Sequence, residues 1–433
     1  RLRIVLPIAE KVKHTCATKW LRQITKMQDW SREQIVDWQN KHLRDFIRHA
    51  YNHTQYYHHL FDTHGLTPDD IQSAADLQKL PILTKDMVNA HYAEFVPDNI
   101  SSIRCRKGKT GGTTGKPMLY LCDENTWGYV TAAKIFYWKK AGWRYGESFV
   151  AFGSASLFGK KPSLARRIYD RIRNEVPMNS VNLNDELCAK YAQIIKQRKI
   201  HFIYGYAASI YLFAQYLEQH NMSVGNIKAV FTTSENLTDD YRHLMERVFQ
   251  CHVVDCYGAR DAGITGYETS YHHYEVGYNA IVELIDKIDD NTGTAVTTNF
   301  LNYSFPLIRY QFGDELSLAD STEYNGQLIT QVIGRTADVM RLSNGRNLTA
   351  TGFSMIMKAF DIVAFDVNKI GDCAVKMRIQ PVEDKYSQEQ EVQIREAIRR
   401  YIGNDCQFEI EYVNQFTALA NGKRRYFMND LSK

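Results

Sequence analysis

The sequence predicts a large α/β domain followed by a small α+β domain, and two patterns carry that prediction. Between about residues 110 and 330, apolar strand-like runs alternate with amphipathic helices. Segments 227–233 and 253–257 are rich in β-branched and aromatic residues, and 239–249 between them has the apolar spacing of a helix. This alternation is typical of parallel strands that are joined by helices.

The second pattern lies in residues 335–433. Segment 375–379 reads as a strand, a helix begins at Ser387 and ends before Gly403, and residues 408–412 alternate as a further strand. A strand–helix–strand unit of this size is large enough to form a small α+β domain of its own.

The first hundred residues are predicted to be mainly helical. Ser31 and Gln34 form a capping-box pattern in front of apolar residues at helical spacing, and Thr67–Pro68 reads as the start of a short helix. We therefore expect an N-terminal domain over residues 1–334 and a mobile C-terminal domain over residues 335–433.

The composition excludes several classes of protein. The 433 residues are 44% hydrophobic, and 53 Lys and Arg against 49 Asp and Glu give a net charge of +4. That balance, without a basic tail, does not indicate a nucleic-acid partner, and no apolar run is long enough for a membrane span. The eight cysteines are scattered without a CxxC pair, so we expect free thiols and a cytoplasmic protein.

The most informative segment is a loop that is rich in glycine and threonine. Such a loop exposes backbone N–H groups and hydroxyls, and a following lysine adds a cation, which together suit phosphate binding. It does not match the Walker A pattern, which excludes a P-loop phosphotransferase, and a plain turn between strands is the alternative. The loop reads Thr110, Gly111, Gly112, Thr113, Thr114, Gly115, Lys116 and Pro117.

Four further segments follow this loop in a fixed order, and together they resemble the adenylate-forming superfamily. In that superfamily the counterparts are a Tyr-Gly motif that ends in an acid, a Gly-Asp ribose motif, a Gly-Arg hinge and a Gly-Lys near the C-terminus. The segments are Tyr257-Gly258-Ala259-Arg260-Asp261, Ile308-Arg309-Tyr310 with Gly313-Asp314, Gly334-Arg335-Thr336-Ala337-Asp338, and Asn421-Gly422-Lys423.

Within the superfamily, the chain is most similar to the phenylacetate–CoA ligase branch with its capsular-polysaccharide biosynthesis relatives. Segment 43–57 and the Leu-Pro-Ile-Leu-Thr-Lys run at 80–85 are similar to elements of that branch. Arg260 stands where general acyl–CoA ligases carry Ser or Thr, and Asp261 replaces their usual Glu. The resemblance therefore implies an adenylate-forming architecture, and the shorter acid leaves the metal ligand open.

The resemblance assigns roles residue by residue. Lys423 would act on the α-phosphate and the attacking carboxylate, Asp261 would be catalytic as the Mg²⁺ ligand, and Asp338 would be the hinge. As bare residues, Lys423 also reads as a surface lysine, Tyr257 as strand packing and Asp314 as a turn residue. The ATP-binding residues would be Thr110, Gly111, Gly112, Thr113, Thr114, Gly115, Lys116, Ser234, Glu235, Tyr257, Gly258, Asp314 and Arg335.

The function that follows from the resemblance is ATP-dependent activation of a carboxylic acid, followed by transfer to an acceptor. The acceptor would be a thiol, amine or hydroxyl, either in polysaccharide or secondary-metabolite synthesis or, alternatively, coenzyme A in an aryl- or acyl-CoA ligase. A non-catalytic nucleotide-binding homologue is the second alternative. The acid and the oligomeric state are not indicated by the sequence.

Three further features of the sequence indicate possible sites more weakly. Cysteine and histidine at 251–252, 256 and 272–273 include potential zinc ligands without forming a complete set. Segment 152–154 is a candidate lining of the acyl pocket. The loop 343–347 is expected to line the acceptor tunnel, with Arg346 facing an anionic acceptor.

Overall fold

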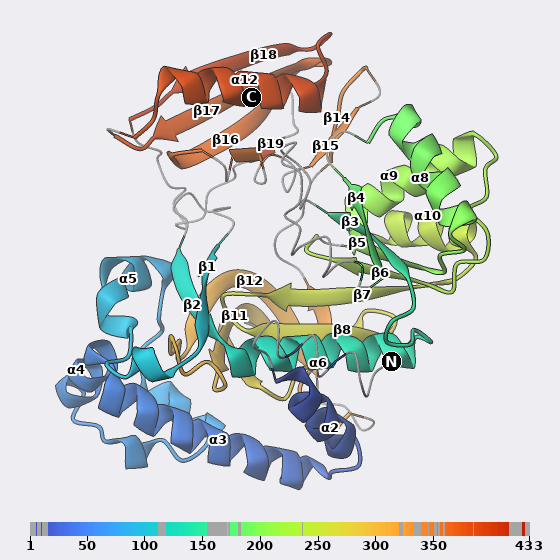
Figure 1. The fold of residues 1–433 in the computed structure, drawn as a ribbon. Coiled ribbons are helices and arrows are strands. Elements are labelled where there is room, and N and C mark those ends of the chain that lie inside the picture. Colours follow the sequence, from blue (N-terminus) through green and yellow to red (C-terminus); the bar gives the residue numbers. More distant parts are fainter. Residues whose placement is uncertain are drawn as a thin grey trace.

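The computed structural model describes most of the chain as a large sheet-based domain and a smaller C-terminal sheet (Figure 1). The described residues are 16–110, 118–153, 174–180, 183–235, 237–319, 324–332, 339–344, 346–349, 360–383, 385–414 and 427–428, together with Leu6, Glu10, Arg171, Phe353, Ile356 and Met357.

Helices form most of the N-terminal segment, as predicted. Ser31 caps its helix as expected, because its side chain accepts from the Gln34 amide while the Gln34 side chain accepts from the Ser31 amide. The predicted helix at Pro68 is a single 3-10 turn. The α-helices are α2 (Ala17–Met27), α3 (Arg32–His53), α4 (Gln55–Thr63) and α5 (Lys85–Ala90), and the 3-10 helices are η1 (Pro68–Asp70), η2 (Ala74–Lys79), η3 (Tyr92–Phe95) and η4 (Ile100–Ser102).

Most of the described strands of the large domain form an 11-stranded sheet with the order β10-β11-β12-β13-β9-β8-β7-β6-β5-β3-β4. The strands are β3 (Phe149–Gly153), β4 (Glu175–Asn179), β5 (Phe202–Tyr206), β6 (Ala229–Thr233), β7 (His252–Ala259), β8 (Ile264–Ser270), β9 (His273–Val276), β10 (Ala280–Asp289), β11 (Thr292–Asn299), β12 (Tyr310–Ala319) and β13 (Leu328–Val332). α6 (Glu124–Lys140) precedes β3, and the described helices between the parallel strands of the sheet are α8 (Asp185–Gln197), α9 (Ala207–Gln219) and α10 (Asp239–Phe249).

The predicted parallel arrangement holds for only one part of this sheet. Strands β3 to β7 pair in parallel, whereas every pairing from β7 through β8, β9, β13, β12 and β11 to β10 is antiparallel. The connections between the strands give the physical reason. Parallel neighbours need a long crossover, usually a helix, and no described helix lies between β7 and β13.

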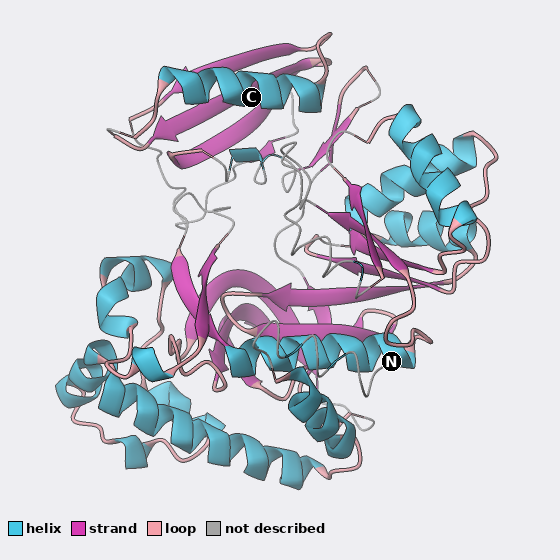
Figure 2. Ribbon diagram, viewed as in Figure 1, coloured by secondary structure: helices cyan, strands magenta, loops and turns pink. Residues whose placement is uncertain are grey.

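The parallel strands are covered on both faces, because successive side chains point to opposite sides. Val230 belongs to the core formed with α8, α9 and α10, whereas the next residue, Phe231, stacks on Trp138 of α6 with ring centroids 4.2 Å apart. Figure 2 shows α8, α9 and α10 gathered on one side of these strands and α6 on the other. The sheet therefore packs on α6 through Phe231 of β6.

A separate hairpin carries the glycine-rich loop. Strands β1 (Cys105–Lys109) and β2 (Leu119–Asp123) pair antiparallel, with Lys109 opposite Leu119. The loop residues 111–117 lie outside the described residues, so their phosphate-binding role stays a prediction.

The small sheet has the order β18-β17-β16-β19 and carries α12 on one face. As predicted, Ser387 caps this helix and Gly403 ends it, with φ of +106°. The described elements after residue 338 are β14 (Val339–Arg341), β15 (Asn347–Thr349), β16 (Ile362–Gly371), β17 (Ala374–Pro381), α12 (Gln388–Ile402), β18 (Gln407–Tyr412) and β19 (Phe427–Met428). The fold class is confirmed, whereas the predicted joint at residues 334–338 lies outside the described residues and the division at 334/335 stays a prediction.

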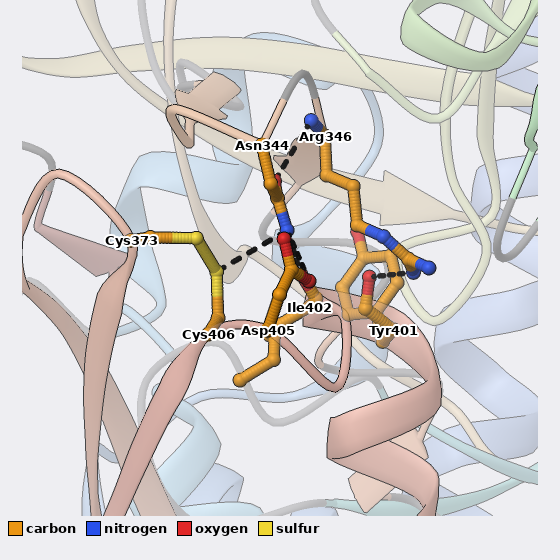
Figure 3. The surroundings of a disulfide bond; sticks show 7 residues. All are labelled: Asn344, Arg346, Cys373, Tyr401, Ile402, Asp405 and Cys406. Atoms are coloured by element: carbon orange, nitrogen blue, oxygen red, sulfur yellow. Dashed lines mark hydrogen bonds between the residues drawn. A yellow bond between two sulfur atoms is a disulfide. The ribbon is translucent and has the colours of Figure 1, made fainter.

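The expectation of eight free thiols is wrong for one pair. Cys373 and Cys406 form a disulfide that joins the β16–β17 turn to the segment before β18, and the other six cysteines are free. The two cysteines are 33 residues apart in the sequence, so a search for CxxC pairs could not predict their bond. Figure 3 shows Asn344 directed at this bridge, where its amide contacts Cys406 Sγ at 3.2 Å.

No helix in the described part of the chain has both the length and the apolar character that a bilayer crossing requires.

Candidate functional site

Thr110 and Met118 close the base of the glycine-rich loop. The Thr110 amide donates to the Met118 carbonyl at 2.9 Å, and the Met118 amide donates to Oγ1 of Thr110 at 2.8 Å. Thr110 therefore has a structural use for its hydroxyl, which holds the two ends of the loop together in addition to any role toward phosphate.

Asp261 lies in the turn between β7 and β8, where Tyr310 holds its side chain. The Tyr310 phenol, which is buried at the start of β12, donates to Oδ2 of Asp261 at 3.0 Å and lies 3.6 Å from the Met118 sulfur. One tyrosine hydroxyl thus connects the base of the loop to the predicted metal ligand. Sequence reasoning quoted Tyr310 only as part of the Ile-Arg-Tyr motif and gave it no role.

The Leu-Pro-Ile-Leu-Thr-Lys run is joined to the same strand. The Leu83 amide donates to the Arg309 carbonyl at 3.1 Å, and the Gln311 amide donates to the Leu83 carbonyl at 2.9 Å. These bonds place Leu83 as a parallel neighbour of Tyr310. The run therefore supports the backbone on which Tyr310 stands.

Tyr257 and Asp314 meet across the folded sheet. The Tyr257 phenol on β7 donates to Oδ2 of Asp314 on β12 at 2.9 Å. These strands are four steps apart in the sheet order, which would separate them by roughly 19 Å in a flat sheet. The contact is possible because the sheet curls, and Figure 1 shows β11 and β12 bending strongly.

Ser234 and Glu235, two of the predicted ATP-binding residues, follow β6. Ser234 has a positive φ of +68°, so the chain turns sharply there. The Glu235 carboxylate is buried, and its Oε2 accepts from the Ala208 amide at the start of α9 at 2.8 Å. Acidic groups are stabilised at helix N-termini, so this contact gives Glu235 a structural role, and its role toward ATP stays a prediction.

A cavity of about 420 Å³ lies between α6 and the strands β5, β7 and β8. It reaches Tyr257, Gly258 and Arg260, next to Asp261, and it is lined by Trp127, Trp138, Trp143, Phe149, Tyr204, Tyr267 and Lys134 among others. The predicted lining by Phe152 is not what the structure shows. Phe152 packs against Tyr191 and Phe213 on the opposite face, and Phe149 of the same strand borders the cavity.

A buried network of charged side chains links α10 and β8 to β7. Arg242 of α10 and Glu268 of β8 have side chains that are each 4% exposed, and their Nη2 and Oε1 atoms are 2.6 Å apart. The other carboxylate oxygen of Glu268 accepts from the Asp255 amide at 2.9 Å. Burial raises the pKa of the Asp255 carboxyl, and hydrogen bonds from Thr232 and Tyr274 oppose that rise. Sequence reasoning missed this network, since no local pattern pairs Arg242 with Glu268.

Most of the remaining predicted site residues lie outside the described part of the chain, whereas Arg346 is described. Gly111 to Lys116, Arg335, Asp338 and Lys423 lie outside the described residues. Arg346 has a structural role: it donates to the carbonyls of Arg400 and Tyr401 at 2.7 and 2.9 Å and so caps the end of α12 (Figure 3). Its role toward an anionic acceptor stays a prediction.

The cysteines and histidines near β7 do not form a metal centre where the chain is described. His272 contacts Asp239 at 3.0 Å, and Cys256 is buried in the sheet. Among the described side chains there is no group of three or more His, Cys, Asp or Glu that could hold a metal ion. Asp261 alone, with phosphate oxygens and water, fits Mg²⁺, which is usually bound by one or two carboxylates.

No family model matches the chain, whereas several known proteins are similar to it over most of its length. Protein CapK of Staphylococcus aureus is 22% identical over 408 residues, which cover 92% of this chain and 90% of CapK. The phenylacetate-coenzyme A ligase of Aromatoleum evansii is 25% identical over 344 residues, 74% of each chain. That of Escherichia coli K12 is 22% identical over 407 residues, 86% of this chain and 88% of the ligase.

A solved structure shows the same fold. 2-Hydroxyisobutyryl-CoA ligase, in complex with 2-HIB-AMP and CoA, aligns with a TM-score of 0.61 at 16% identity, over 92% of this chain and 90% of that one. At this identity the likeness concerns the fold alone. The chain is therefore similar over most of its length to CapK and the phenylacetate–coenzyme A ligases, and it has the fold of the adenylate-forming enzymes.

Proposed function

We propose that this protein activates a carboxylic acid with ATP as an acyl adenylate and then transfers the acyl group to an acceptor. The observation that carries the proposal is the set of contacts from Thr110 through Met118 and Tyr310 to Asp261, next to the pair formed by Tyr257 and Asp314. These contacts join three distant motifs, and one of them, the Tyr-Gly motif, lines the cavity with Tyr257 and Gly258.

In the first step, a carboxylate oxygen attacks the α-phosphorus of ATP. The acyl O–P bond forms, the bond between the α-phosphorus and its bridging oxygen breaks, and pyrophosphate leaves. Two anions approach each other, so cations and oriented dipoles have to neutralise the developing charge. Mg²⁺ held by Asp261 would supply part of that charge, and Tyr310 fixes the carboxylate that would bind it.

The nucleotide would be held by groups from several strands. The loop from Thr110 to Lys116 would donate its amides, hydroxyls and ammonium to the β- and γ-phosphates. Asp314 would accept from the ribose hydroxyls with help from Arg335, and the Tyr257 ring would stack on the adenine bordered by Ser234, Glu235 and Gly258.

Lys423 would bring its ammonium to the α-phosphate and the attacking carboxylate. Its segment precedes β19, which pairs in parallel with β16 of the small sheet. A rotation of the small domain about Asp338 would then exchange Lys423 for the acceptor.

Coenzyme A is the acceptor that the relatives favour, since several of them are named coenzyme A ligases. Its thiolate would attack the acyl carbon, form the thioester and release AMP. An amine or hydroxyl on a sugar or a carrier is the alternative acceptor, and a nucleotide-binding protein without catalysis is the alternative function.

Carboxylate-dependent exchange of labelled pyrophosphate into ATP tests the proposal. The acids to screen are aromatic, aliphatic and amino acids and sugar acids, with and without coenzyme A. We expect exchange with at least one acid, and a loss of roughly 10²- to 10³-fold in Lys423→Ala with ATP binding retained. Arg425→Ala is the matched control, because Arg425 belongs to the same run of positively charged residues, Lys423-Arg424-Arg425. Full exchange in Lys423→Ala would remove this lysine from the mechanism, and no exchange with any acid would favour the non-catalytic alternative.

A further inference from the structure

Arg309 has a left-handed backbone conformation directly before strand β12. Its φ is +52°, and the next residue is Tyr310, whose phenol donates to Asp261 at 3.0 Å. Long side chains rarely adopt this conformation, because the Cβ atom comes too close to the following carbonyl oxygen. Glycine would adopt it without strain. An arginine at this position therefore indicates that its side chain contributes something that glycine could not.

The guanidinium group of Arg309 is held from two sides. Its Nη2 lies 3.1 Å from a carboxylate oxygen of Glu283 on β10, and its Nε lies 3.2 Å from both oxygens of that carboxylate. Its Nη1 donates to the Leu80 carbonyl at 2.6 Å. Strand β11 lies between β10 and β12, so the side chain reaches past one strand to its ionic partner. Several bonds to a planar guanidinium fix its orientation as well as its position.

The backbone of Arg309 is fixed on both sides as well. Its amide donates to Oγ1 of Thr298 at 3.0 Å, and its carbonyl accepts from the Leu83 amide at 3.1 Å. That carbonyl belongs to the peptide unit that leads into Tyr310. A change of conformation at Arg309 would rotate this unit and would move the phenol most, because the phenol is the far end of the Tyr310 side chain. One peptide unit thus couples the contacts of Arg309 to the position of the phenol.

We propose that Arg309 is a positioning residue for the metal site, because Glu283 and Leu80 hold it in the left-handed conformation that directs the Tyr310 phenol onto Asp261. The inference rests on the proposed function, in which Asp261 holds Mg²⁺. A strained backbone persists only where the surrounding contacts over-determine it, and it is then often part of a functional site. Here the strained residue orients the carboxylate before the metal binds, which reduces the ordering cost of binding.

Arg309→Ala and Arg309→Gly separate the backbone conformation from the ion pair. Both variants remove the guanidinium and leave Glu283 without this partner, but only glycine adopts a positive φ freely. The readout is the binding of Mn²⁺, used in place of Mg²⁺, together with α,β-methylene-ATP. The electron paramagnetic resonance signal of free Mn²⁺ measures it against the same mixture without protein, so neither an acid nor turnover is needed. We expect the Mn²⁺ affinity to fall roughly fivefold in Arg309→Ala and less than about twofold in Arg309→Gly.

Two further comparisons show whether the effect passes through the phenol. In a Tyr310→Phe background the donor is absent, so the alanine and glycine variants of Arg309 should bind Mn²⁺ equally. Gln250 is the matched control position, because it has a φ of +54° at the end of α10. Gln250→Ala and Gln250→Gly should differ from each other in the free energy of unfolding, and both should bind Mn²⁺ as the wild-type protein does.

Equal Mn²⁺ affinity in Arg309→Ala and Arg309→Gly would overturn the proposal, as would a difference that remains in the Tyr310→Phe background. A wild-type protein that binds no Mn²⁺ with the ATP analogue would overturn it too. If Arg309→Ala does not fold, both variants are compared with Glu283→Gln added, which removes the unpaired charge. Failure of the proposed function is a separate result, since it would appear as absent pyrophosphate exchange with every acid while the difference in Mn²⁺ binding persists.

Discussion

Tyr257 donates a hydrogen bond of 2.9 Å from its phenol to Oδ2 of Asp314, a residue 57 positions further along the chain. Asp314 is buried at this point, so the bond from Tyr257 helps to orient its carboxylate. In the proposed role of Asp314, this contact would orient the acceptor of the two ribose hydroxyls before the nucleotide binds.

Tyr257→Phe should therefore weaken ATP binding while keeping the ring. We expect the KM for ATP to rise roughly fivefold, which corresponds to about 1 kcal/mol for one lost hydrogen bond, with a smaller change in kcat. Pyrophosphate exchange at varied ATP measures it. Tyr271→Phe is the control, because it removes another tyrosine–aspartate bond, that of Tyr271 to Asp239, at an exposed site. A KM that does not change would show that the phenol does not position Asp314 for the ribose.

Tyr310→Phe should alter the requirement for Mg²⁺. The phenol is buried and donates to Asp261 at 3.0 Å, so its loss frees the carboxylate to rotate. We expect the Mg²⁺ concentration for half-maximal exchange to rise several-fold, with activity recovered at high Mg²⁺. Tyr51→Phe, which removes an exposed bond to Asp62, should leave the Mg²⁺ titration unchanged. An equal loss of activity at every Mg²⁺ concentration would contradict a role through the metal ligand.

Local signals in the sequence were sufficient for the ends of several elements. Ser31 and Ser387 cap their helices as predicted, and helix 239–249 has the predicted bounds, because capping depends on residues three or four positions apart. The order of the motifs along the chain could also be recognised, and it was sufficient to predict the fold class and the resemblance to the adenylate-forming superfamily.

Features that depend on contacts between residues far apart in the sequence could not be predicted from it. The curl of the sheet that joins Tyr257 to Asp314, the Cys373–Cys406 bridge and the place of Lys134 against Tyr204 all join segments that are far apart in sequence. A hydrophobic pattern predicts which face of an element is buried and leaves open which other element covers it.

Arg242→Met should strongly destabilise the large domain. It would leave the Glu268 carboxylate buried without its 2.6 Å partner, and breaking a buried ion pair from one side costs about 3–5 kcal/mol. Urea denaturation, followed by tryptophan fluorescence, measures the free energy of unfolding. The double variant Arg242→Met with Glu268→Gln should recover much of the loss, because no uncompensated charge remains. A double variant as unstable as the single one would instead indicate that the packing of Arg242 matters more than its charge.

Removal of the disulfide should destabilise the small domain selectively. Closing a loop of 33 residues restricts the unfolded chain by about 3–4 kcal/mol at most. All six tryptophans precede residue 144, so hydrogen exchange of β17 and β18 is the better probe. We expect reductant, or Cys373→Ser with Cys406→Ser, to speed exchange there and to leave β5 and β6 unchanged. Reductant should have no further effect on the double variant, and slow exchange in reduced wild-type protein would contradict a stabilising role.

Asp123 should make stability fall as the pH rises from about 4 to 6. It caps α6 by accepting from the Thr126 amide and also accepts from the Tyr303 amide, but burial dominates and raises its pKa from 3.8 to about 6. Between these values the folded state keeps a proton that the unfolded state has lost. The folded state is therefore favoured below pH 4 and loses that advantage through pH 6, and the difference of about two pH units corresponds to about 3 kcal/mol.

Asp123→Asn isolates this effect, because an amide does not titrate. The free energy of unfolding of the wild-type protein minus that of the variant should fall by about 2 kcal/mol between pH 4 and pH 7, measured by urea denaturation at each pH. Asp70→Asn provides a control of opposite sign. Hydrogen bonds from Thr67 lower the pKa of Asp70, so its contribution is present above pH 4 and is lost as the pH falls below it. A flat difference for Asp123 from pH 4 to pH 7 would mean that this carboxyl titrates in its ordinary range in spite of its burial.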